Sequence, residues 1–216
     1  MASQAIHRRW RRLLLAVVLA TCLLNPASAP AQEVWGSLAA ARTEFERAAW
    51  QADFVQTYVP AGFTSGERET GRLAMTLPGR MRWDYSLPYD KVFLIRGAEA
   101  YTWNPGETTG RKALLEAGER EHLALLELDT ASLRELYSAS IDTRDPGILE
   151  ILFEPLDRDT DIRSAYLALE PSTHRILELS YSDLEGNETR FELSGHRIAA
   201  QADLFDPPPD LDWLED

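Results

Sequence analysis

The stretch RMRWDYSLPYDKVFLIRGAEAYTWNP, Arg80–Pro105, is dense in aromatic side chains and decides what kind of fold to expect. Met81 and Trp83 alternate with charged residues, which is the period-two pattern of a strand with one buried face. Turn residues separate this run from two further short strands, predicted at Lys91–Arg96 and Ala100–Asn104. No catalytic acid, metal cluster or glycine-rich phosphate loop accompanies the aromatic residues. The stretch therefore predicts apolar sheet surface rather than chemistry.

Similar patterns continue on both sides of this stretch. Apolar residues at helical spacing predict an amphipathic helix over Gln32–Ala49. The leucine-rich region Glu119–Ser138 predicts a helical insert, and three prolines exclude a helix from the tail LFDPPPDLDWLED. The other strands predicted from alternation lie at Trp50–Tyr58, Gly71–Leu77, Ile148–Phe153, Ala165–Leu169, Ile176–Tyr181 and Thr189–Leu193.

The predicted order of elements is a helix, about five strands, a helical insert, about four strands and an extended tail. This order has no βαβ alternation, so it predicts a mainly β (α+β) fold built on an antiparallel sheet. A curved sheet with the two helical segments across its opening encloses either a cavity or a core. Strand pattern alone leaves open whether the apolar residues line a ligand site or form an ordinary closed core.

The first 31 residues have the plan of a secretory signal peptide. Four arginines precede an apolar run, Leu13–Leu24, and the small residues of Ala27–Ala31 follow it. We expect cleavage after Ala31, which leaves residues 32–216 as a single domain without cysteine. One alternative is an uncleaved N-terminal anchor. The other is that Cys22, the only cysteine, is the acylated cysteine of a bacterial lipoprotein.

The chain is strongly acidic, with a net charge of −13, and removal of the four N-terminal arginines would make it more negative. This charge argues against binding of nucleic acid and against attraction to anionic lipid headgroups. It keeps the protein soluble and permits electrostatic attraction to a basic partner.

Motifs of known chemistry are missing from the sequence. It contains no nucleophile elbow, no zinc-protease pair of histidines and no nucleotide-binding loop. Asp157, Asp159 and Asp161 begin like a calcium loop, but Ile162 and Ala168 stand where the loop needs glycine and glutamate. Carboxylates are numerous, and no particular pair indicates glycosidase chemistry. We therefore predict a protein that is not an enzyme and needs no metal or cofactor.

Several weak motifs occur together in one order over nearly the whole chain after residue 31. They are DFVQTYV at Asp53–Val59, Gly71 and Pro78 followed by the stretch quoted above, FEP at Phe153–Pro155, and LFDPPPDLDW near the end. In this order and at this spacing the chain resembles the LolA family, the periplasmic carriers of outer-membrane lipoproteins.

The resemblance implies an incomplete antiparallel β-barrel of about 9–11 strands, with a helical lid over an apolar cavity. It implies a periplasmic monomer that accepts acylated lipoproteins from an ATP-driven releasing complex of the inner membrane and passes them to the outer-membrane acceptor LolB. Two alternatives keep the fold: a carrier of glycolipid or another amphiphile, or an envelope-stress sensor that detects stray lipoproteins. An enzyme or an unrelated structural β-protein is the alternative from another class.

Under this interpretation, apolar strand positions form the cavity wall and apolar helical positions form the lid. The candidate wall residues are Trp50, Phe54, Leu73, Met75, Met81, Trp83, Leu94, Trp103, Leu167, Leu169, Leu179 and Phe191. The candidate lid residues are Val34, Leu38, Phe45, Leu126, Leu133 and Leu136. At about 0.8 kcal/mol per buried CH₂, one acyl chain of about sixteen carbons is worth about 12 kcal/mol, so a soluble carrier must offer an apolar site of similar quality.

One position departs from the family pattern. Family members usually carry a basic residue, commonly arginine, directly before the proline that starts the Arg-Trp strand, and in the best-known members this arginine holds the lid closed. Here Leu77 stands before that proline. Arg80 and Arg82 lie nearby and are possible substitutes. The residue that holds the lid is therefore left open at this stage.

Overall fold

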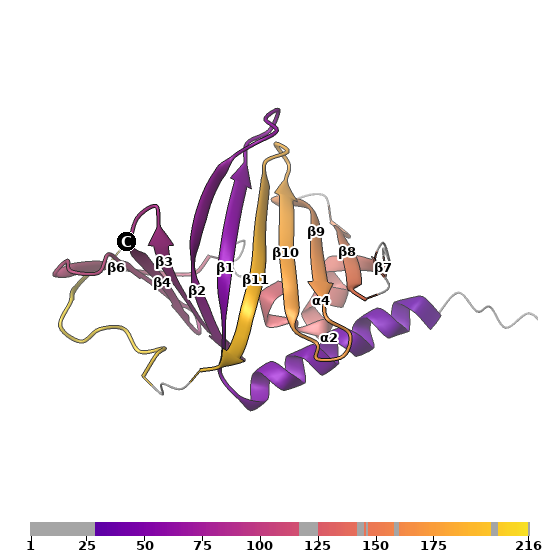
Figure 1. The fold of residues 1–216 in the computed structure, drawn as a ribbon, viewed down its shortest axis with the longest axis horizontal. Helices are drawn as coiled ribbons and strands as arrows, with labels where there is room; N and C mark the ends of the chain where they lie inside the picture. Colours follow the sequence, from indigo (N-terminus) through magenta and orange to yellow (C-terminus); the bar gives the residue numbers. More distant parts are fainter. Residues whose placement is uncertain are drawn as a thin grey trace, which may run out of the picture.

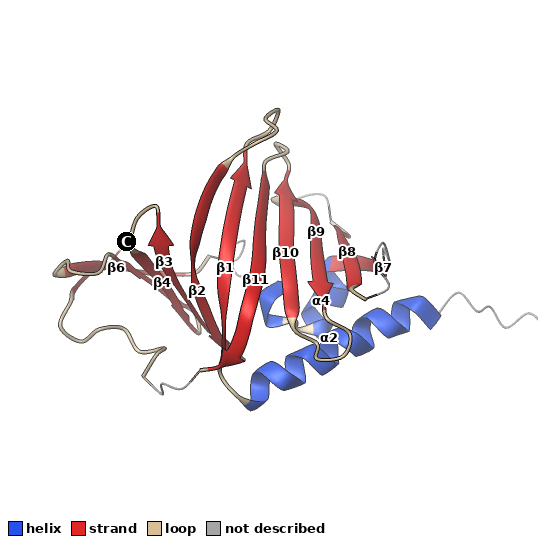
Figure 2. Cartoon of the chain, in the orientation of Figure 1, coloured by secondary structure: helices blue, strands red, loops and turns tan. Residues whose placement is uncertain are grey.

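The computed structural model describes residues 29–116, 125–141, 145, 147–157, 160–199 and 203–215. Most of them belong to one open sheet of twelve strands (Figure 2). The strands are β1 (Trp50–Val59), β2 (Glu67–Thr76), β3 (Arg80–Leu87), β4 (Lys91–Arg96), β5 (Glu99–Trp103), β6 (Thr109–Leu114), β7 (Tyr137–Ile141), β8 (Leu149–Pro155), β9 (Ile162–Leu169), β10 (Ile176–Asp183), β11 (Glu188–Ile198) and β12 (Asp212–Glu215).

The sheet consists of two meanders that meet in its middle (Figure 1). Strands β1 to β6 pair in sequence order on one side, and β7 to β11 pair in sequence order on the other. The two sets are joined by the antiparallel pair β1–β11, with Phe54 opposite Leu193. Strand β12 adds to the free edge of β6 and is parallel to it. The sheet is unclosed, because β12 and β7 form its two ends.

Two labelled helices accompany the sheet. Helix α2 (Ala29–Arg47) runs directly into the start of β1 and contacts β2, β7 and α4 (Figure 1). Helix α4 (Thr130–Leu136) follows a helical turn at 125–127 and leads without a loop into β7. Its N-cap is Asp129, whose carboxylate accepts hydrogen bonds from the Ala131 N–H and the Ser132 hydroxyl. Capping of this kind satisfies N–H groups that have no partner inside the helix.

Buried apolar side chains form two clusters, one on each face of the sheet. The inner cluster contains side chains of both helices and of most strands, from Val34 on α2 to Leu193 on β11. The outer cluster contains Ala74, Val92, Leu94, Tyr101, Trp103, Leu204 and Phe205. Leu204 and Phe205 belong to the C-terminal segment 203–215, so this segment covers the outer face as the helices cover the inner face.

The prediction of a mainly β fold with an antiparallel, incompletely closed sheet is confirmed. Three strands were not predicted, namely β6, β7 and β12. Strand β6 (TGRKAL) and strand β7 (YSASI) lack an alternating run of large apolar residues, and β12 follows three prolines. The helical insert ends two residues earlier than predicted, because Tyr137 already belongs to β7. The predicted signal peptide up to residue 28, with Cys22, and positions 119–124 of the insert lie outside the described residues.

Candidate functional site

The inner face of the sheet is an apolar surface made by cross-strand pairs. Strand register places Leu73 opposite Trp83, and Met75 opposite both Trp50 on β1 and Met81 on β3. Because side chains alternate across a strand, these pairs share one face. Nine of the predicted wall residues belong to the inner cluster: Trp50, Phe54, Leu73, Met75, Met81, Trp83, Leu167, Leu169 and Leu179. Phe191 is partly buried against the same cluster.

Aromatic rings extend this face towards the ends of the strands. The ring centroids of Phe54 and Tyr85 are 4.9 Å apart in an edge-to-face arrangement, and those of Trp83 and Phe93 are 5.6 Å apart. The Tyr85 hydroxyl donates a hydrogen bond of 2.7 Å to Gln56, which satisfies its polar atom within apolar surroundings. Burial raises the pKa of Tyr85, and nearby Glu69 acts in the same direction, so the hydroxyl stays neutral.

The helices cover this surface with a closely matching apolar face. Val34, Leu38 and Leu133 are completely buried, and Phe45 and Leu126 belong to the same inner cluster. Leu136 is partly buried against it. All six predicted lid residues therefore lie against the sheet. In this arrangement the side chains of the lid occupy the inner face that a ligand would use.

Two predicted wall residues lie on the opposite face. Leu94 is paired with Arg82, and Trp103 is paired with Val92, and both belong to the outer cluster beneath the C-terminal segment. The expectation that Leu94 and Trp103 share one wall with the other ten residues is therefore corrected. In the run Val-Phe-Leu-Ile every residue is apolar, so the sequence does not indicate which parity faces inward. The inward residues of this strand are Phe93 and Ile95.

Leu77, at the position where the family usually carries a basic residue, is part of the apolar core. It belongs to the inner cluster and has 6% exposure. Its backbone N–H donates a hydrogen bond of 3.3 Å to the Phe45 carbonyl near the end of α2. Leu77 therefore joins the lid to the sheet through packing and one backbone hydrogen bond, not through charge.

For the two nearby arginines that were possible substitutes, no hydrogen bond or ion pair to the lid is seen within the described residues. Arg82 donates to the carboxylate of Asp84 at 2.8 Å and to the Leu204 carbonyl at 3.0 Å, and its guanidinium lies 5.4 Å from the centre of the Trp103 ring. These partners belong to the outer face and its cover. Arg80 is exposed and lies opposite Arg96 in the next strand.

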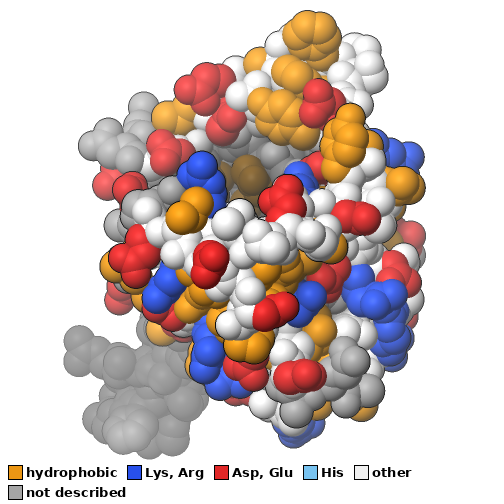
Figure 3. Space-filling view, turned by 90° about the vertical axis from the view of Figure 1, so that its left-hand side faces the viewer, with side chains coloured by type: hydrophobic (Ala, Val, Ile, Leu, Met, Phe, Trp, Pro, Cys, Tyr) orange, Lys and Arg blue, Asp and Glu red, His pale blue; other side chains and the backbone are white. Residues whose placement is uncertain are grey.

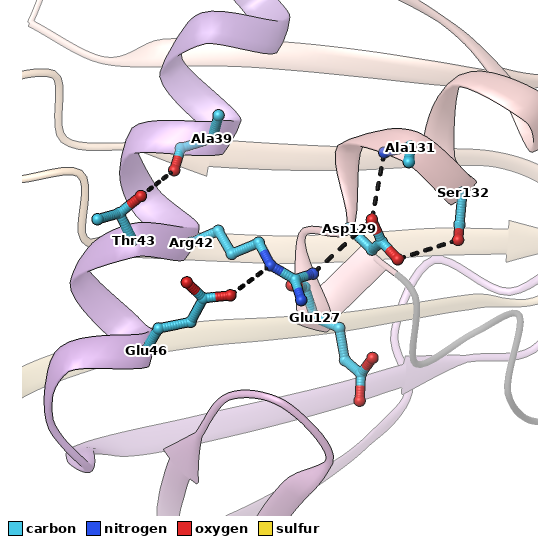
Figure 4. A network of polar contacts seen from close by, with 8 residues as sticks. All are labelled: Ala39, Arg42, Thr43, Glu46, Glu127, Asp129, Ala131 and Ser132. Carbon is cyan, nitrogen blue, oxygen red and sulfur yellow. Dashed lines mark hydrogen bonds and ion pairs between the residues drawn. The ribbon is translucent and has the colours of Figure 1, made fainter.

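A different arginine connects the two parts of the lid (Figure 4). Arg42 on α2 donates through Nη1 to the Glu127 carbonyl at 3.0 Å, and the same nitrogen lies 3.9 Å from the carboxylate of Asp129. Its Nε donates to Glu46 at 2.8 Å, which holds the guanidinium along the helix. One side chain thus joins α2 to the residues that begin α4. Sequence reasoning missed Arg42, because an arginine on an amphipathic helix is usually a solvated surface residue.

Glu127 extends this connection to the sheet. Its carboxylate lies beside Gly79, in the turn between β2 and β3, whose backbone N–H favours the charged form of the carboxyl. Burial is the main influence on this carboxyl and raises its pKa, while Arg42 and the Gly79 N–H partly offset the effect. Arg42 thus bonds to Glu127, and Glu127 in turn lies beside Gly79, so that the three residues lead from α2 to the sheet. We call this set of three residues the Arg42 link.

A pocket of about 560 Å³ lies among β3, β4, β5 and β6. Tyr85 and Phe93 of the inner face contribute to its lining, together with the cations Lys91 and Arg111. Lys91 lies 4.3 Å from the centre of the Tyr85 ring and forms an ion pair of 2.7 Å with Glu69. Figure 3 shows the molecule from the β6 side, where apolar side chains lie deep in a hollow with charged side chains around it. We call the pocket beside Tyr85 and Phe93 the side pocket.

The described residues show no group of three or more histidine, cysteine or carboxylate side chains that could hold a metal ion. Among the same residues, no helix is both long enough and apolar enough to cross a membrane. The fold and the site together define a protein with an open β-sheet whose apolar face is closed by a helical lid. The chain matches the family model described as "Outer membrane lipoprotein carrier protein LolA" over residues 47–208, and it belongs to this family.

Relatives in the family are distant in sequence but similar in extent. The outer-membrane lipoprotein carrier protein of Methylococcus capsulatus is 24% identical over 172 residues, which are 77% of this chain and 81% of the relative. That of Nitrosomonas europaea is 25% identical over 223 residues, covering 95% of this chain and 99% of the relative. The Pseudomonas aeruginosa MucA/MucB complex has a similar fold, with a TM-score of 0.50 at 14% identity over 83% of this chain and 62% of that chain.

Proposed function

We propose that this protein is a periplasmic chaperone that holds the acyl chains of lipoproteins between its helical lid and the inner face of its sheet. The observation that carries the proposal is the single apolar cluster shared by lid and sheet, in which Leu38 and Leu133 of the helices meet the surface around Trp83. Family membership supports the same conclusion and is the ground on which we regard the protein as a carrier and not an enzyme.

Loading requires the lid to move, because its own side chains fill the inner face. Acyl chains would then replace the lid residues as partners of the sheet, so that apolar surface stays covered in both states. The polar groups to be separated are few. Among the described residues they include the hydrogen bond from Leu77 to Phe45, the hydrogen bond from the Leu156 N–H to the Leu136 carbonyl at the end of α4, and the Arg42 link. We propose that the Arg42 link takes the place of the family arginine as the contact that holds the lid closed.

The side pocket is the proposed entrance for acyl chains. It adjoins the inner face at Tyr85 and Phe93. A chain that enters there first meets aromatic side chains and then, as the lid moves, the surface around Trp83. The rest of the lining combines the apolar side chains of Val92, Trp103 and Leu214 with polar and charged ones, and the latter suit the linker between the acyl groups and the protein part of the cargo.

The energetics of the cargo determine which partners are required. Three acyl chains of about sixteen carbons represent about 35 kcal/mol of apolar transfer free energy, so extraction from a membrane needs an outside energy source. We propose the ATP-driven releasing complex of the inner membrane as this source and LolB as the outer-membrane acceptor. Transfer to the acceptor needs only a small difference in affinity, since 1.4 kcal/mol is already tenfold. The carrier would act as a monomer.

An envelope-stress sensor or a carrier of another amphiphile is the second candidate function. Leu77 in place of the basic residue favours it, as does the fold shared with MucB, which was crystallised in complex with MucA. Mass spectrometry of ligand that co-purifies with the protein separates the candidates. Acylated lipoprotein is expected for the chaperone, and free lipid or glycolipid would favour the second function.

The direct test is release of a triacylated lipoprotein from inner-membrane vesicles in the presence of ATP. Trp83→Glu is expected to abolish capture of the lipoprotein, because it places a carboxylate on the buried inner face. Trp213→Glu is the matched control, because Trp213 packs against the outer cluster and does not line the side pocket, and it is expected to leave capture by the folded protein unchanged. Circular dichroism verifies folding, and Trp83→Ala is used if Trp83→Glu does not fold. Normal capture by folded Trp83→Glu would contradict the proposed site.

A further inference from the structure

A second pocket, of about 590 Å³, lies where the lid joins the sheet. Three segments far apart in the sequence line it: the end of α2 with the start of β1, the turn at 172–175 before β10, and the end of β11 at 196–198. It is separate from the side pocket, with which it shares no lining residue. We call it the hinge pocket, because the connection between α2 and β1 lies in its wall.

Aromatic rings form one wall of the hinge pocket. The ring centroids of Phe45 and Trp50 are 4.9 Å apart, and the His196 ring stacks on Trp50 with centroids 5.7 Å apart. Ile198 also lines the pocket and is 75% exposed. This wall is therefore partly apolar and open to solvent. His196 contributes no cation, because burial lowers its pKa, and one of its ring nitrogens lies 2.7 Å from the Ile176 carbonyl.

The charged residues of the hinge pocket are mainly basic, in contrast to the rest of this acidic chain. Arg47, Arg175 and Arg197 line it, and the lining contains one carboxylate, that of Glu44. Arg47 pairs with Glu44, and Arg197 pairs with Asp53 at 3.2 Å. In the part of the chain that the structure describes, no ion pair is recorded for the guanidinium of Arg175, which is exposed. This cation is available to a ligand.

Trp50, which lines this pocket, also carries a buried donor that lacks an acceptor. Trp50 is 7% exposed, and its indole N–H has no hydrogen-bond partner among the described residues. Buried polar groups in native proteins nearly always have a partner, so an unpaired donor in a pocket wall indicates a missing acceptor. A carboxylate or phosphate oxygen provides such an acceptor and also carries the charge that Arg175 would pair with.

We propose that the hinge pocket binds the anionic group of an amphiphile, either a phosphate or a carboxylate. The charge pairs with Arg175, an oxygen accepts from the Trp50 indole N–H, and the apolar chain lies along Phe45 and Ile198. A ligand in this position contacts the last turn of α2, the turn before β10 and the end of β11. The proposal does not depend on the carrier function, because the hinge pocket shares no lining residue with the proposed entrance, although Phe45 and Trp50 also belong to the inner cluster.

The test follows the indole N–H signal of Trp50 by two-dimensional ¹H–¹⁵N NMR, with assignment by its disappearance in Trp50→Phe. Decyl phosphate is the probe, and it is expected to shift the Trp50 signal more than that of Trp83. Inorganic phosphate has the negative charge without the apolar chain, and decyltrimethylammonium has the apolar chain with a positive charge. The two compounds therefore test the contributions of the charge and of the chain separately. Equal affinity for decyltrimethylammonium would overturn the anion site. Equal affinity for inorganic phosphate would show a site for free anions and overturn the assignment to an amphiphile.

Two variants test the residues. Arg175→Glu is expected to weaken decyl phosphate binding about tenfold, because it reverses the charge that faces the ligand. Arg68→Glu, a reversal at an exposed position on β2, is the matched control and should leave the affinity unchanged. Trp50→Phe preserves most of the ring and should weaken binding about fivefold by removing the donor. Unchanged affinity in both Arg175→Glu and Trp50→Phe would overturn the proposal, whatever the result of the lipoprotein release experiment.

Discussion

The two faces of the sheet are both covered, but they are covered in different ways. The C-terminal segment on the outer face is fastened by a backbone ladder, because β12 pairs with β6 from Asp212 to Glu215. Arg82 also donates to its Leu204 carbonyl. The lid on the inner face is held by apolar packing, by the backbone hydrogen bonds from Leu77 to Phe45 and from Leu156 to Leu136, and by the Arg42 link.

This difference indicates which of the two, the C-terminal segment or the lid, can open reversibly. Opening the outer cover breaks strand pairing as well as packing, whereas opening the lid breaks no strand pairing in the described residues. A ligand of acyl chains can replace the packing that the lid loses, but it cannot replace a backbone ladder. The inner cover is therefore the better candidate for a reversible lid, and the outer cover is a permanent part of the fold.

The largest expected effect concerns the C-terminal segment that covers the outer face. Phe205→Ala should lower the free energy of unfolding by about 3 kcal/mol, because Phe205 is 4% exposed and its removal leaves a cavity in the outer cluster. Urea denaturation measures this change. The affinity for an apolar fluorophore that binds the inner face should change less than about twofold, which is under about 0.4 kcal/mol. A large loss of fluorophore affinity in the folded variant would show that the two faces are not independent.

A smaller effect is expected at the lid. Arg42→Ala should favour lid opening by about 1–2 kcal/mol, because it removes a charged hydrogen bond to the Glu127 carbonyl. Amide hydrogen exchange in α2 and α4 should then become about tenfold faster than in the unmodified protein. Arg47→Ala is the matched control, since Arg47 pairs with Glu44 on the same helix and is well exposed. Equal exchange rates in both variants would exclude Arg42 as the residue that holds the lid.

The smallest effect concerns Glu127 and depends on pH. Burial raises the pKa of Glu127 in the folded protein, so its contribution to stability is fully present below the unfolded value of 4.5 and is lost as pH rises through the folded pKa. Glu127→Gln has nearly the same shape and carries no charge. The variant should therefore be slightly more stable than the unmodified protein at pH 7, by less than about 1 kcal/mol because the group is partly exposed.

At pH 4 this difference between Glu127→Gln and the unmodified protein should vanish. Urea denaturation at both pH values measures it. Glu44→Gln, which removes an exposed carboxylate from α2, serves as the control. A variant that is less stable than the unmodified protein at pH 7 would mean that the charge of Glu127 strengthens the Arg42 link.

Sequence patterns predicted the inner face better than the edges of the sheet. Alternation around Trp83 and Leu73 identifies strands with one buried face, and tertiary pairing preserves that parity. Where both faces of a strand are buried, as at Leu94, the pattern does not show which side chains point to the inner face. The prediction that Leu94 lies on the inner face was therefore wrong. The Arg42 link depends on a contact across 85 positions, which local patterns do not encode. The helix that carries Arg42 was predicted, but the hydrogen bond from Arg42 to the Glu127 carbonyl was not.

The position of β1 in the middle of the sheet has a consequence for folding during synthesis. Strand β1 is the first strand to be made, yet one of its two neighbours, β11, is the eleventh. The first meander can form early, because it consists of local hairpins. Until β11 is made, β1 is an exposed edge strand, and such an edge can pair with strands of other chains. Aggregation should therefore be most sensitive to the interval in which the N-terminal half of the sheet is complete and the C-terminal half is not.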